Sequence, residues 1–174
     1  MSIDQLPEIA LAMVASGKGI IAIDESNATI KKRFDSVGVE CTEENRRAYR
    51  EMLLTTPNLN EYISGAILYD ETIHQKTKDG VPFTKIMLDN GILPGIKVDA
   101  GTTPLAGFPG EVVTQGLDGL RERLNEYAAL GAKFAKWRAV ININIEEGMP
   151  SDTCIEANVH ALARYAALCQ EAGI

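Results

Sequence analysis

The 174-residue sequence contains few of the residues that build disulfide frameworks and metal sites, namely three cysteines and two histidines. Cys41, Cys154 and Cys169 are odd in number, and no two of them have the spacing of a metal-ligand pair, so reduced thiols are expected. His74 and His160 are far apart in the sequence, and we interpret both as structural or surface residues. This composition predicts no metal site.

The sequence also lacks an excess of basic residues and any membrane-spanning segment. Its 17 lysines and arginines are outnumbered by 24 aspartates and glutamates, which gives a net charge of −7. An acidic surface disfavours nucleic acid and anionic membranes as partners, and no signal or transit peptide is evident. We therefore expect a cytoplasmic protein in which a local cluster of lysine and arginine holds any phosphate-bearing ligand.

Short β-like segments alternate with helical patterns along the chain. The segments are residues 19–23, 63–69, 92–98 and 134–140. Their starts lie roughly 30 to 45 residues apart, which is typical of repeated βα units and an α/β fold with a parallel sheet. Four such units are half of an eight-stranded barrel, which needs about 250 residues, or most of a smaller open sheet. The pattern alone leaves both architectures open.

Four helices are predicted from end signals and apolar spacing. The N-terminal residues 1–15 form an amphipathic pattern. Thr42 is expected to cap a helix, and Gly131 to end another. Thr153 and Glu156 form a capping box for a last helix, which ends at Gly173. The residues expected to form apolar helix faces are Leu6, Ala10, Met13 and Val14; Leu117, Leu120, Leu124 and Tyr127; and Ile155, Val159, Leu162, Ala166 and Cys169.

One connection is unusually long. Residues 99–116 contain glycines at 101, 107, 110 and 116 and prolines at 104 and 109. A loop of this length in a compact domain is usually functional or mobile. Because it follows a predicted strand, it is expected at the C-terminal face of the sheet.

Charged residues share one face of three predicted strands. Alternate residues of a strand point to opposite sides, so Lys136 and Arg138 share a face, as do Lys97 and Asp99. Asp24 lies on the corresponding face at the end of the first strand. Burying cations without partners is costly, so an anion-binding site explains the pattern better than core packing does. The opposite, apolar face comprises Ile21, Ile23, Pro94, Ile96, Val98, Ala135, Trp137 and Ala139.

The chemistry of this cluster is that of phosphate binding and proton transfer. The Arg138 guanidinium is a planar fork suited to phosphate or carboxylate, whereas Lys97 and Lys136 are point charges. A lysine can also act as an acid, a base or an imine-forming nucleophile, and Asp24 could relay protons. No phosphate-binding glycine motif is present, so nucleotide binding has no support.

Several segments of the sequence resemble class I fructose-bisphosphate aldolases. They are GKGI at 17–20, DES at 24–26, TEENRR at 42–47, GIKVD at 95–99, PLAG at 104–107, TQGLDGL at 114–120, FAKWR at 134–138 and ANVHALARY at 157–165. Each segment alone is weakly specific, but together they occur in the family's order at nearly its spacing.

The resemblance implies a (β/α)₈ barrel that reversibly cleaves fructose 1,6-bisphosphate into dihydroxyacetone phosphate and glyceraldehyde 3-phosphate, a reaction of glycolysis and gluconeogenesis. It also implies a metal-independent lyase without a cofactor, in which a lysine forms an imine with the ketone. The expected partner is a phosphorylated sugar, and the expected assembly of the full-length protein is a homotetramer.

The resemblance assigns roles to individual residues. Asp24 matches the strand-1 aspartate that assists proton transfer during carbon–carbon cleavage. Lys136 matches the strand-4 lysine beside the imine carbon. Lys97 and Arg138 match residues that hold a substrate phosphate.

Three further residues match the family near the same site. Thr29 stands where many members have a phosphate-contacting serine. Arg33 and Arg46 match arginines near the site mouth, although a solvated helix face explains Arg46 equally well. Ala100 replaces a lysine that is often found there, and residues 142–150 differ from the animal pattern.

By resemblance, residues 1–174 are the first four βα units of a single barrel domain and stop before strand 5. The strand-5 glutamates and the Schiff-base lysine of strand 6 are then not in this chain, and the chain alone is expected to be inactive. Two alternatives remain from the residues: another imine-forming barrel lyase similar to transaldolase, and a non-catalytic phosphate-binding or scaffold fragment.

Overall fold

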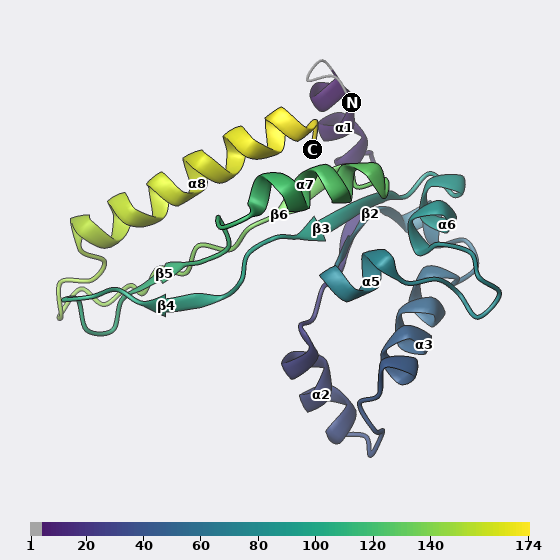
Figure 1. The fold of residues 1–174 in the computed structure, drawn as a ribbon, viewed down its shortest axis with the longest axis horizontal. Helices are drawn as coiled ribbons and strands as arrows, with labels where there is room; N and C mark the ends of the chain where they lie inside the picture. The colour runs from purple at the N-terminus through teal and green to yellow at the C-terminus, as the bar shows by residue number, and fades with distance from the viewer. Residues whose placement is uncertain (1–4) are drawn as a thin grey trace.

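The computed structural model describes residues 5–174, and its centre is a four-stranded parallel sheet. The strands are β1 (Gly19–Ile23), β2 (Ile63–Leu68), β3 (Leu93–Lys97) and β6 (Phe134–Lys136). They pair in the order β1-β2-β3-β6, so strands that follow one another in the sequence are neighbours in the sheet (Figure 1). This confirms the predicted parallel sheet of four βα units, in the strand order of half a (β/α)₈ barrel.

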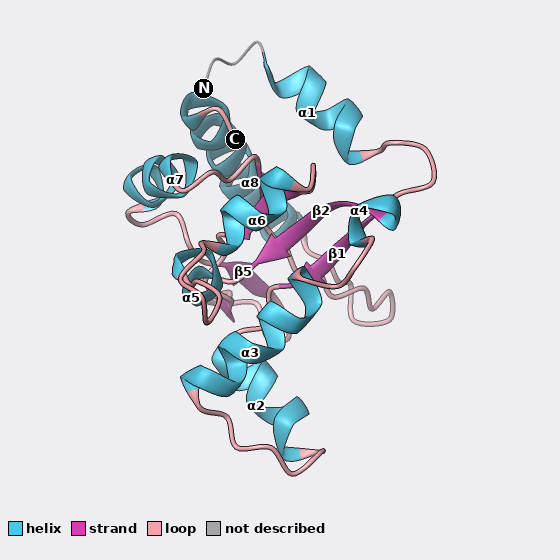
Figure 2. Cartoon of the chain, turned by 90° about the vertical axis from the view of Figure 1, so that its right-hand side faces the viewer, coloured by secondary structure: helices cyan, strands magenta, loops and turns pink. Residues whose placement is uncertain are grey.

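Helices precede and follow the strands, and those from α3 onward contribute residues to the core on one face of the sheet. They are α1 (Leu6–Met13), α2 (Asn27–Asp35), α3 (Glu43–Leu54), α4 (Leu59–Tyr62), α5 (Asp70–His74), α6 (Phe83–Asp89), α7 (Leu120–Ala129) and α8 (Asp152–Ala172). The core lies between the sheet and these helices, where Ala66 and Ile96 meet Met87 of α6 and Leu124 of α7. Helices α7 and α8 lie side by side, and α1 lies beside the C-terminal end of α8 (Figures 1 and 2).

The predicted alternation of strand faces is confirmed. Ile23, Ile96 and Val98 belong to the buried core, and Ile21, Ala135 and Trp137 pack against it. The opposite face carries Lys97 and Lys136. On this face Lys97 and Lys136 line a cavity, so the charged side chains reach an open space rather than a packed interior.

The fourth strand is shorter than predicted, because β6 ends at Lys136 rather than at residue 140. Among residues 5–174 its only partner is β3, which itself ends at Lys97. One more hydrogen bond follows, from the amide of Val98 to the carbonyl of Lys136 at 3.1 Å. Beyond this point no backbone in the described part of the chain continues the ladder, so Arg138 lies outside the strand.

The connection at 99–116 begins at the C-terminal face of the sheet, as predicted, where Asp99, Ala100 and Gly101 line a cavity, but it is not a loop throughout. Residues Thr102–Pro104 form β4 and Val112–Thr114 form β5, and the two pair in an antiparallel hairpin. The hairpin is held to α8, because Asn158 accepts a hydrogen bond from the amide of Thr114 at 3.4 Å and donates to the carbonyl of Val112 at 3.1 Å. The glycine- and proline-rich segment is therefore built into the fold.

The predicted capping box of α8 is also wrong. Ser151 is the N-cap, and its hydroxyl accepts a hydrogen bond from the amide of Cys154 at 3.1 Å. The buried face also differs: it includes Cys154, Asn158 and Ala161, and Cys169 as predicted, while the predicted core residues Ile155 and Val159 are 42% and 56% exposed. Packing of α8 on α7 and β5 sets which face is buried.

The remaining helix predictions have mixed outcomes. Thr42 caps α3, as predicted, by accepting a hydrogen bond from the amide of Asn45. Gly131, at φ 104°, follows the end of α7, and Gly173, at φ 73°, ends α8. The predicted N-terminal helix covers only Leu6–Met13, buries no residue and leaves Val14 74% exposed. Its first predicted residues, 1–4, lie outside the described part.

All three cysteines are free, and Cys154 and Cys169 are buried on α8 as core residues.

Candidate functional site

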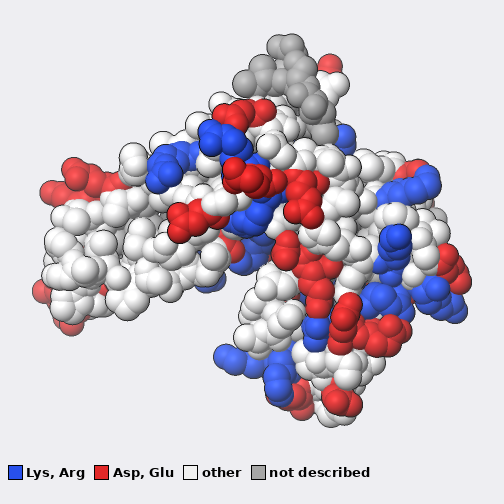
Figure 3. Space-filling view, in the orientation of Figure 1, with Lys and Arg blue, Asp and Glu red and all other residues white. Residues whose placement is uncertain are grey.

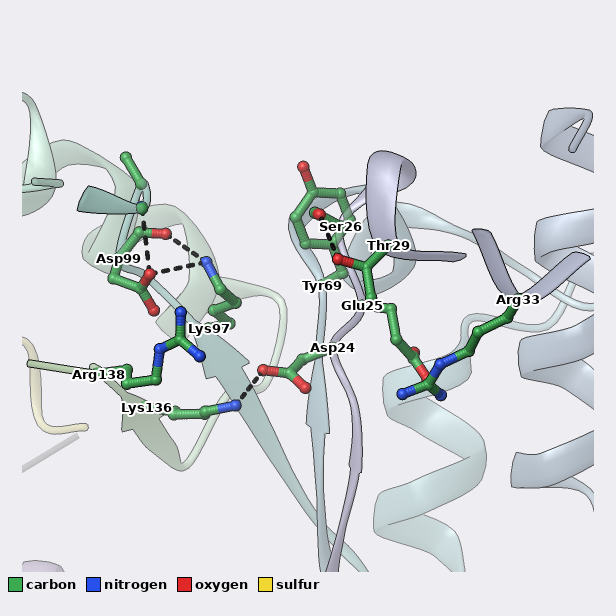
Figure 4. A pocket seen from close by; sticks show the side chains of 12 residues that line it. Asp24, Glu25, Ser26, Thr29, Arg33, Tyr69, Lys97, Asp99, Lys136 and Arg138 are labelled. Atoms are coloured by element: carbon green, nitrogen blue, oxygen red, sulfur yellow. Dashed lines mark hydrogen bonds and ion pairs between the residues drawn. The ribbon is translucent and has the colours of Figure 1, made fainter. Parts of the chain in front are cut away.

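A cavity of about 580 Å³ opens at the C-terminal ends of the parallel strands. Charged and polar side chains from β1, β3 and β6, and from the segments that follow them, point into it (Figure 4). The lining residues are Asp24, Glu25, Ser26, Thr29, Arg33, Tyr69, Lys97, Asp99, Ala100, Gly101, Lys136 and Arg138. The cluster predicted from strand alternation is therefore gathered in one space.

Asp24 and Lys136 form an ion pair across this cavity, with the Lys136 Nζ atom 2.5 Å from the Asp24 Oδ2 atom. Their side chains are 11% and 34% exposed. The two residues lie at the ends of the outermost strands, β1 and β6, with β2 and β3 between them. A flat sheet would hold these strands about 14 Å apart. The contact therefore shows that the sheet curves around the cavity, as a barrel wall does.

Lys97 is held by Asp99, two residues further along the chain. Its Nζ atom donates to the Asp99 carbonyl oxygen at 2.6 Å and lies 3.0 Å from the Asp99 Oδ1 atom. The same Oδ1 atom accepts a hydrogen bond from the amide of Gly101 at 3.2 Å. Asp99 is thus fixed to the backbone, and it fixes the Lys97 amine at the cavity wall.

Arg138 supplies a cation that is not neutralised. Its guanidinium lies between Lys97 and Lys136 in the cavity (Figure 4), and within residues 5–174 no acidic side chain pairs with it. Its backbone is anchored from the hairpin, because the Thr114 hydroxyl donates to the Arg138 carbonyl at 2.8 Å. A fixed guanidinium without an acidic partner, beside two amines, suits a phosphate group.

The β1–α2 segment forms the opposite wall. The Ser26 and Thr29 hydroxyl oxygens lie 3.2 Å apart, and the guanidinium of Arg33 pairs with the carboxylate of Glu25. Thr29 and Arg33 therefore lie at the cavity, the place expected of them. Sequence analysis did not identify Glu25, Ser26 or Tyr69 as lining residues. The available signal was position: Glu25 and Ser26 follow Asp24 directly, and Tyr69 follows β2 as Asp24 follows β1.

Arg46 is the exception among the expected residues, because it does not line the cavity. Its guanidinium forms a two-pronged contact with the Glu71 carboxylate, at 2.8 and 2.5 Å, and donates to the Cys41 carbonyl at 2.9 Å. The hydrogen bonds to Glu71 hold the pKa of Arg46 above its ordinary value. Arg46 thus joins α3 to α5 through an ion pair with Glu71, which is a structural contact.

Charged residues are unevenly spread over the rest of the molecule. On the face shown in Figure 3, acidic and basic side chains intermingle over α2, α3 and the middle of the chain, whereas the end that carries the β4–β5 hairpin is largely uncharged. Among residues 5–174, no three His, Cys, Asp or Glu side chains are grouped to hold a metal ion. Within the same range, no helix combines the length and apolarity needed to span a bilayer.

Comparison with known proteins assigns the family. The family model described as fructose-bisphosphate aldolase class-I matches residues 5–174. The chain belongs to the class I fructose-bisphosphate aldolases. The "Probable fructose-bisphosphate aldolase class 1" of Xanthomonas campestris pv. campestris is 75% identical over 174 residues, which are 100% of this chain and 52% of that protein. The cytoplasmic isozyme of the aldolase from Spinacia oleracea is 54% identical over 171 residues, or 98% and 47%.

A solved aldolase shares the fold. The fructose-bisphosphate aldolase of Plasmodium falciparum, in a co-crystal with TRAP and a small-molecule inhibitor, superposes with a TM-score of 0.96 at 47% identity. The match covers 99% of this chain and 50% of that structure. The aldolase chain described here thus spans about half the length of the curated relatives it matches, and its sheet is part of an aldolase α/β barrel.

Proposed function

We propose that this aldolase chain is the N-terminal half of a single-barrel, metal-independent lyase. The complete enzyme would reversibly cleave fructose 1,6-bisphosphate into dihydroxyacetone phosphate and glyceraldehyde 3-phosphate in glycolysis and gluconeogenesis. The observation that carries the proposal is the cavity in which Arg138 and Lys97 lie beside the Asp24–Lys136 ion pair. Candidate phosphate-binding residues and a candidate acid–base pair therefore line the same cavity.

The phosphate-binding role falls to Lys97 at the end of β3, to Arg138 just beyond β6, and to residues on the opposite wall. Arg138 can offer two parallel N–H donors to a phosphate, and Lys97 adds a positive charge. The Thr29 hydroxyl supplies a neutral hydrogen bond from the other side, and Arg33 lies at the same wall. The overall charge of −7 makes such a local basic cluster necessary for binding an anionic sugar phosphate.

The proton-transfer role falls to the ion pair. In this proposal the Asp24 carboxylate assists proton movement at the hydroxyl where the carbon–carbon bond breaks, and the Lys136 ammonium stabilises negative charge that develops nearby. The imine itself would form on a lysine of strand 6, outside this chain, and two glutamates of strand 5 would complete the acid–base steps. Lys136 is paired with a carboxylate, which suits an electrostatic role.

The proposal extends to the setting of the complete enzyme. We expect a cytoplasmic homotetramer that needs neither a metal nor an organic cofactor. The aldolase family match leaves no support for the transaldolase-like alternative. The non-catalytic alternative applies to residues 1–174 alone, because covalent catalysis cannot proceed without its nucleophile.

A paired assay tests the proposal. The complete protein and residues 1–174 are purified separately, assayed for cleavage of fructose 1,6-bisphosphate, and treated with dihydroxyacetone phosphate and borohydride. We expect turnover and a trapped adduct in the complete protein, on a lysine outside this chain, and neither in residues 1–174. An adduct on Lys136 accompanied by turnover in the shorter chain would refute the assignment of roles.

A further inference from the structure

Behind the cavity wall, one buried arginine holds the segment that carries Asp24. Arg50 lies on α3 and is only 2% exposed. Its Nη2 atom donates to the carbonyl oxygen of Glu25 at 3.1 Å and lies 3.0 Å from the Glu25 Oε2 atom. One guanidinium therefore contacts both the backbone and the carboxylate of the residue that follows Asp24.

This contact constrains the direction of the Asp24 side chain. Asp24 pairs with Lys136 in the cavity, whereas the carboxylate of the next residue, Glu25, contacts Arg50 of α3. Rotation of the backbone at Glu25 would rotate its neighbour as well. A fixed carbonyl and a fixed carboxylate at Glu25 thus hold the Asp24 carboxylate at its 2.5 Å contact with Lys136.

The same carboxylate also contacts a second arginine, on α2 of the same cavity wall. The Arg33 guanidinium pairs with the Oε1 atom of Glu25, and Arg33 is 59% exposed, whereas the Glu25 side chain is 6% exposed. Glu25 is thus shared between a buried arginine and an exposed one. The three side chains form a chain of ion pairs in the order Arg50, Glu25, Arg33. Arg50 is its buried end, and Arg33 is the end at the cavity.

The burial of Arg50 is not explained by stability. Its Nε and Nη1 atoms have no hydrogen-bond partner within residues 5–174. Burial lowers the pKa of Arg50, and the charge of Glu25 opposes that effect. An apolar side chain of similar volume usually packs in such a place at lower cost, while a buried ion pair specifies one geometry. The arrangement trades stability for a defined position of Glu25.

We propose that Arg50 is a positioning residue of the aldolase reaction, which acts through Glu25 to orient Asp24 and Arg33. The inference rests on the proposed function, in which Asp24 takes part in proton transfer. Arg50 itself touches no cavity space, so it contributes to the rate only through the residues it holds.

The first test compares kinetics in the complete enzyme. Arg50→Met should lower kcat about tenfold to a hundredfold, the loss expected from misplacing a catalytic group by about 1 Å. KM should change little, because Arg50 contacts neither Lys97 nor Arg138, which hold the phosphate in the proposed function. Arg50→Lys should recover part of the rate, since the ammonium keeps the positive charge and N–H donors but lacks the planar fork of the guanidinium. The matched control is Arg47→Met on the same helix, where Arg47 pairs with Glu44 and Glu51, and it should keep the wild-type kcat.

A second measurement separates positioning from folding. The double variant Glu25→Gln/Arg50→Met removes the buried carboxylate that has lost its buried partner and keeps only the exposed Arg33, so its melting temperature should rise above that of Arg50→Met while its kcat stays low. If kcat instead follows the melting temperature across all variants, Arg50 is merely structural and the inference is overturned. An unchanged kcat in a folded Arg50→Met variant overturns it equally.

A third measurement does not depend on turnover. Acetic anhydride labels free amines, and the Asp24 contact should protect Lys136 in the wild type, as followed by mass spectrometry. Loss of that protection in Arg50→Met, with Lys97 labelled as before, supports the positioning role even if the wild type fails to cleave fructose 1,6-bisphosphate. Unchanged protection of Lys136 contradicts it, whereas an inactive wild type alone contradicts the proposed function.

Discussion

The aromatic ring of Phe134 occupies the space beside Gly95 that any other residue would need. The two residues are directly paired across β3 and β6, and a Cβ atom placed on Gly95 would lie 2.3 Å from the Cζ atom of the ring. The ring also reaches Gly65 of β2, where such an atom would lie 3.0 Å from its Cε1 atom. Phe134 thus covers two strands below the cavity, and it can do so only because both neighbours lack side chains.

This packing predicts that Gly95→Ala is destabilising. The added methyl group must displace the ring and its surroundings, which costs about 1–3 kcal/mol of unfolding free energy. Gly19→Ala in β1 is the control, because a Cβ atom there has no neighbour within 4 Å. In urea denaturation, the midpoint should fall below the wild-type value for Gly95→Ala but not for Gly19→Ala. The double variant Gly95→Ala/Phe134→Leu should recover part of the lost stability. Equal midpoints for both glycine variants would contradict the packing.

Arg138→Ala should weaken binding of a phosphorylated sugar far more than binding of the unphosphorylated sugar. The guanidinium lines the cavity without an acidic partner in the described chain, and a lost charge-assisted contact is worth about 1.5–3 kcal/mol. Calorimetric titration of the complete enzyme with fructose 1,6-bisphosphate and with fructose measures the difference. Arg121→Ala serves as the control, since Arg121 pairs with Glu171 on the outer surface. Equal losses of affinity for both sugars would show that Arg138 does not bind the phosphate group.

The two candidate caps of α8 can be told apart by single substitutions. Ser151→Ala removes the acceptor of the Cys154 amide and should cost about 0.5–2 kcal/mol. Thr153→Ala changes an exposed residue of the first turn and should stay within about 0.5 kcal/mol of the wild type. Thermal or chemical unfolding of both variants decides between them. A larger loss for Thr153→Ala would restore the cap expected from the sequence.

The pair formed by His74 and Glu126 should make stability depend on pH. Burial opposes protonation of His74, but hydrogen bonds to the Asp70 carbonyl, at 2.8 Å, and to the Glu126 carboxylate, at 2.9 Å, outweigh it and raise the pKa of His74 above 6.5. Because the folded pKa is the higher one, this stabilisation is complete below about pH 6.5 and is lost as pH rises through the folded value.

His74→Gln should therefore reduce the free energy of unfolding more at about pH 5.5 than at about pH 8.5. Urea denaturation at both values measures the difference. Glu126→Gln should show the same trend, and the double variant should lose less than the sum of the two single losses, because they remove one interaction. A loss that is independent of pH would mean that the pair is not charged in the folded protein.

Part of the candidate site was predictable because strand geometry is local. Alternation places Lys97 and Lys136 on the face opposite Ile96 and Ala135 whatever the strands pair with, and the spacing of the segments predicts a parallel sheet. The matching motifs then indicated the family. Strand alternation could not predict the distance between Asp24 and Lys136. These residues are 112 positions apart in the sequence, and their 2.5 Å contact exists only because the sheet curves.

The sequence by itself determined the four parallel strands apart from the end of β6, their charged face, the Thr42 cap and the glycine that ends α8, since each depends on backbone preferences within a few residues. Tertiary structure decided the rest through partners distant in sequence. Ser151 caps α8. It is held there by Glu111, forty residues earlier, whose carboxylate accepts hydrogen bonds from the amide and the hydroxyl of Ser151. Arg46 is drawn from the cavity by Glu71, and β6 stops where β3 no longer offers a backbone partner. The local sequence determines which interactions a side chain can make. Which partner it binds depends on folding, because the competing partners lie far away in the sequence.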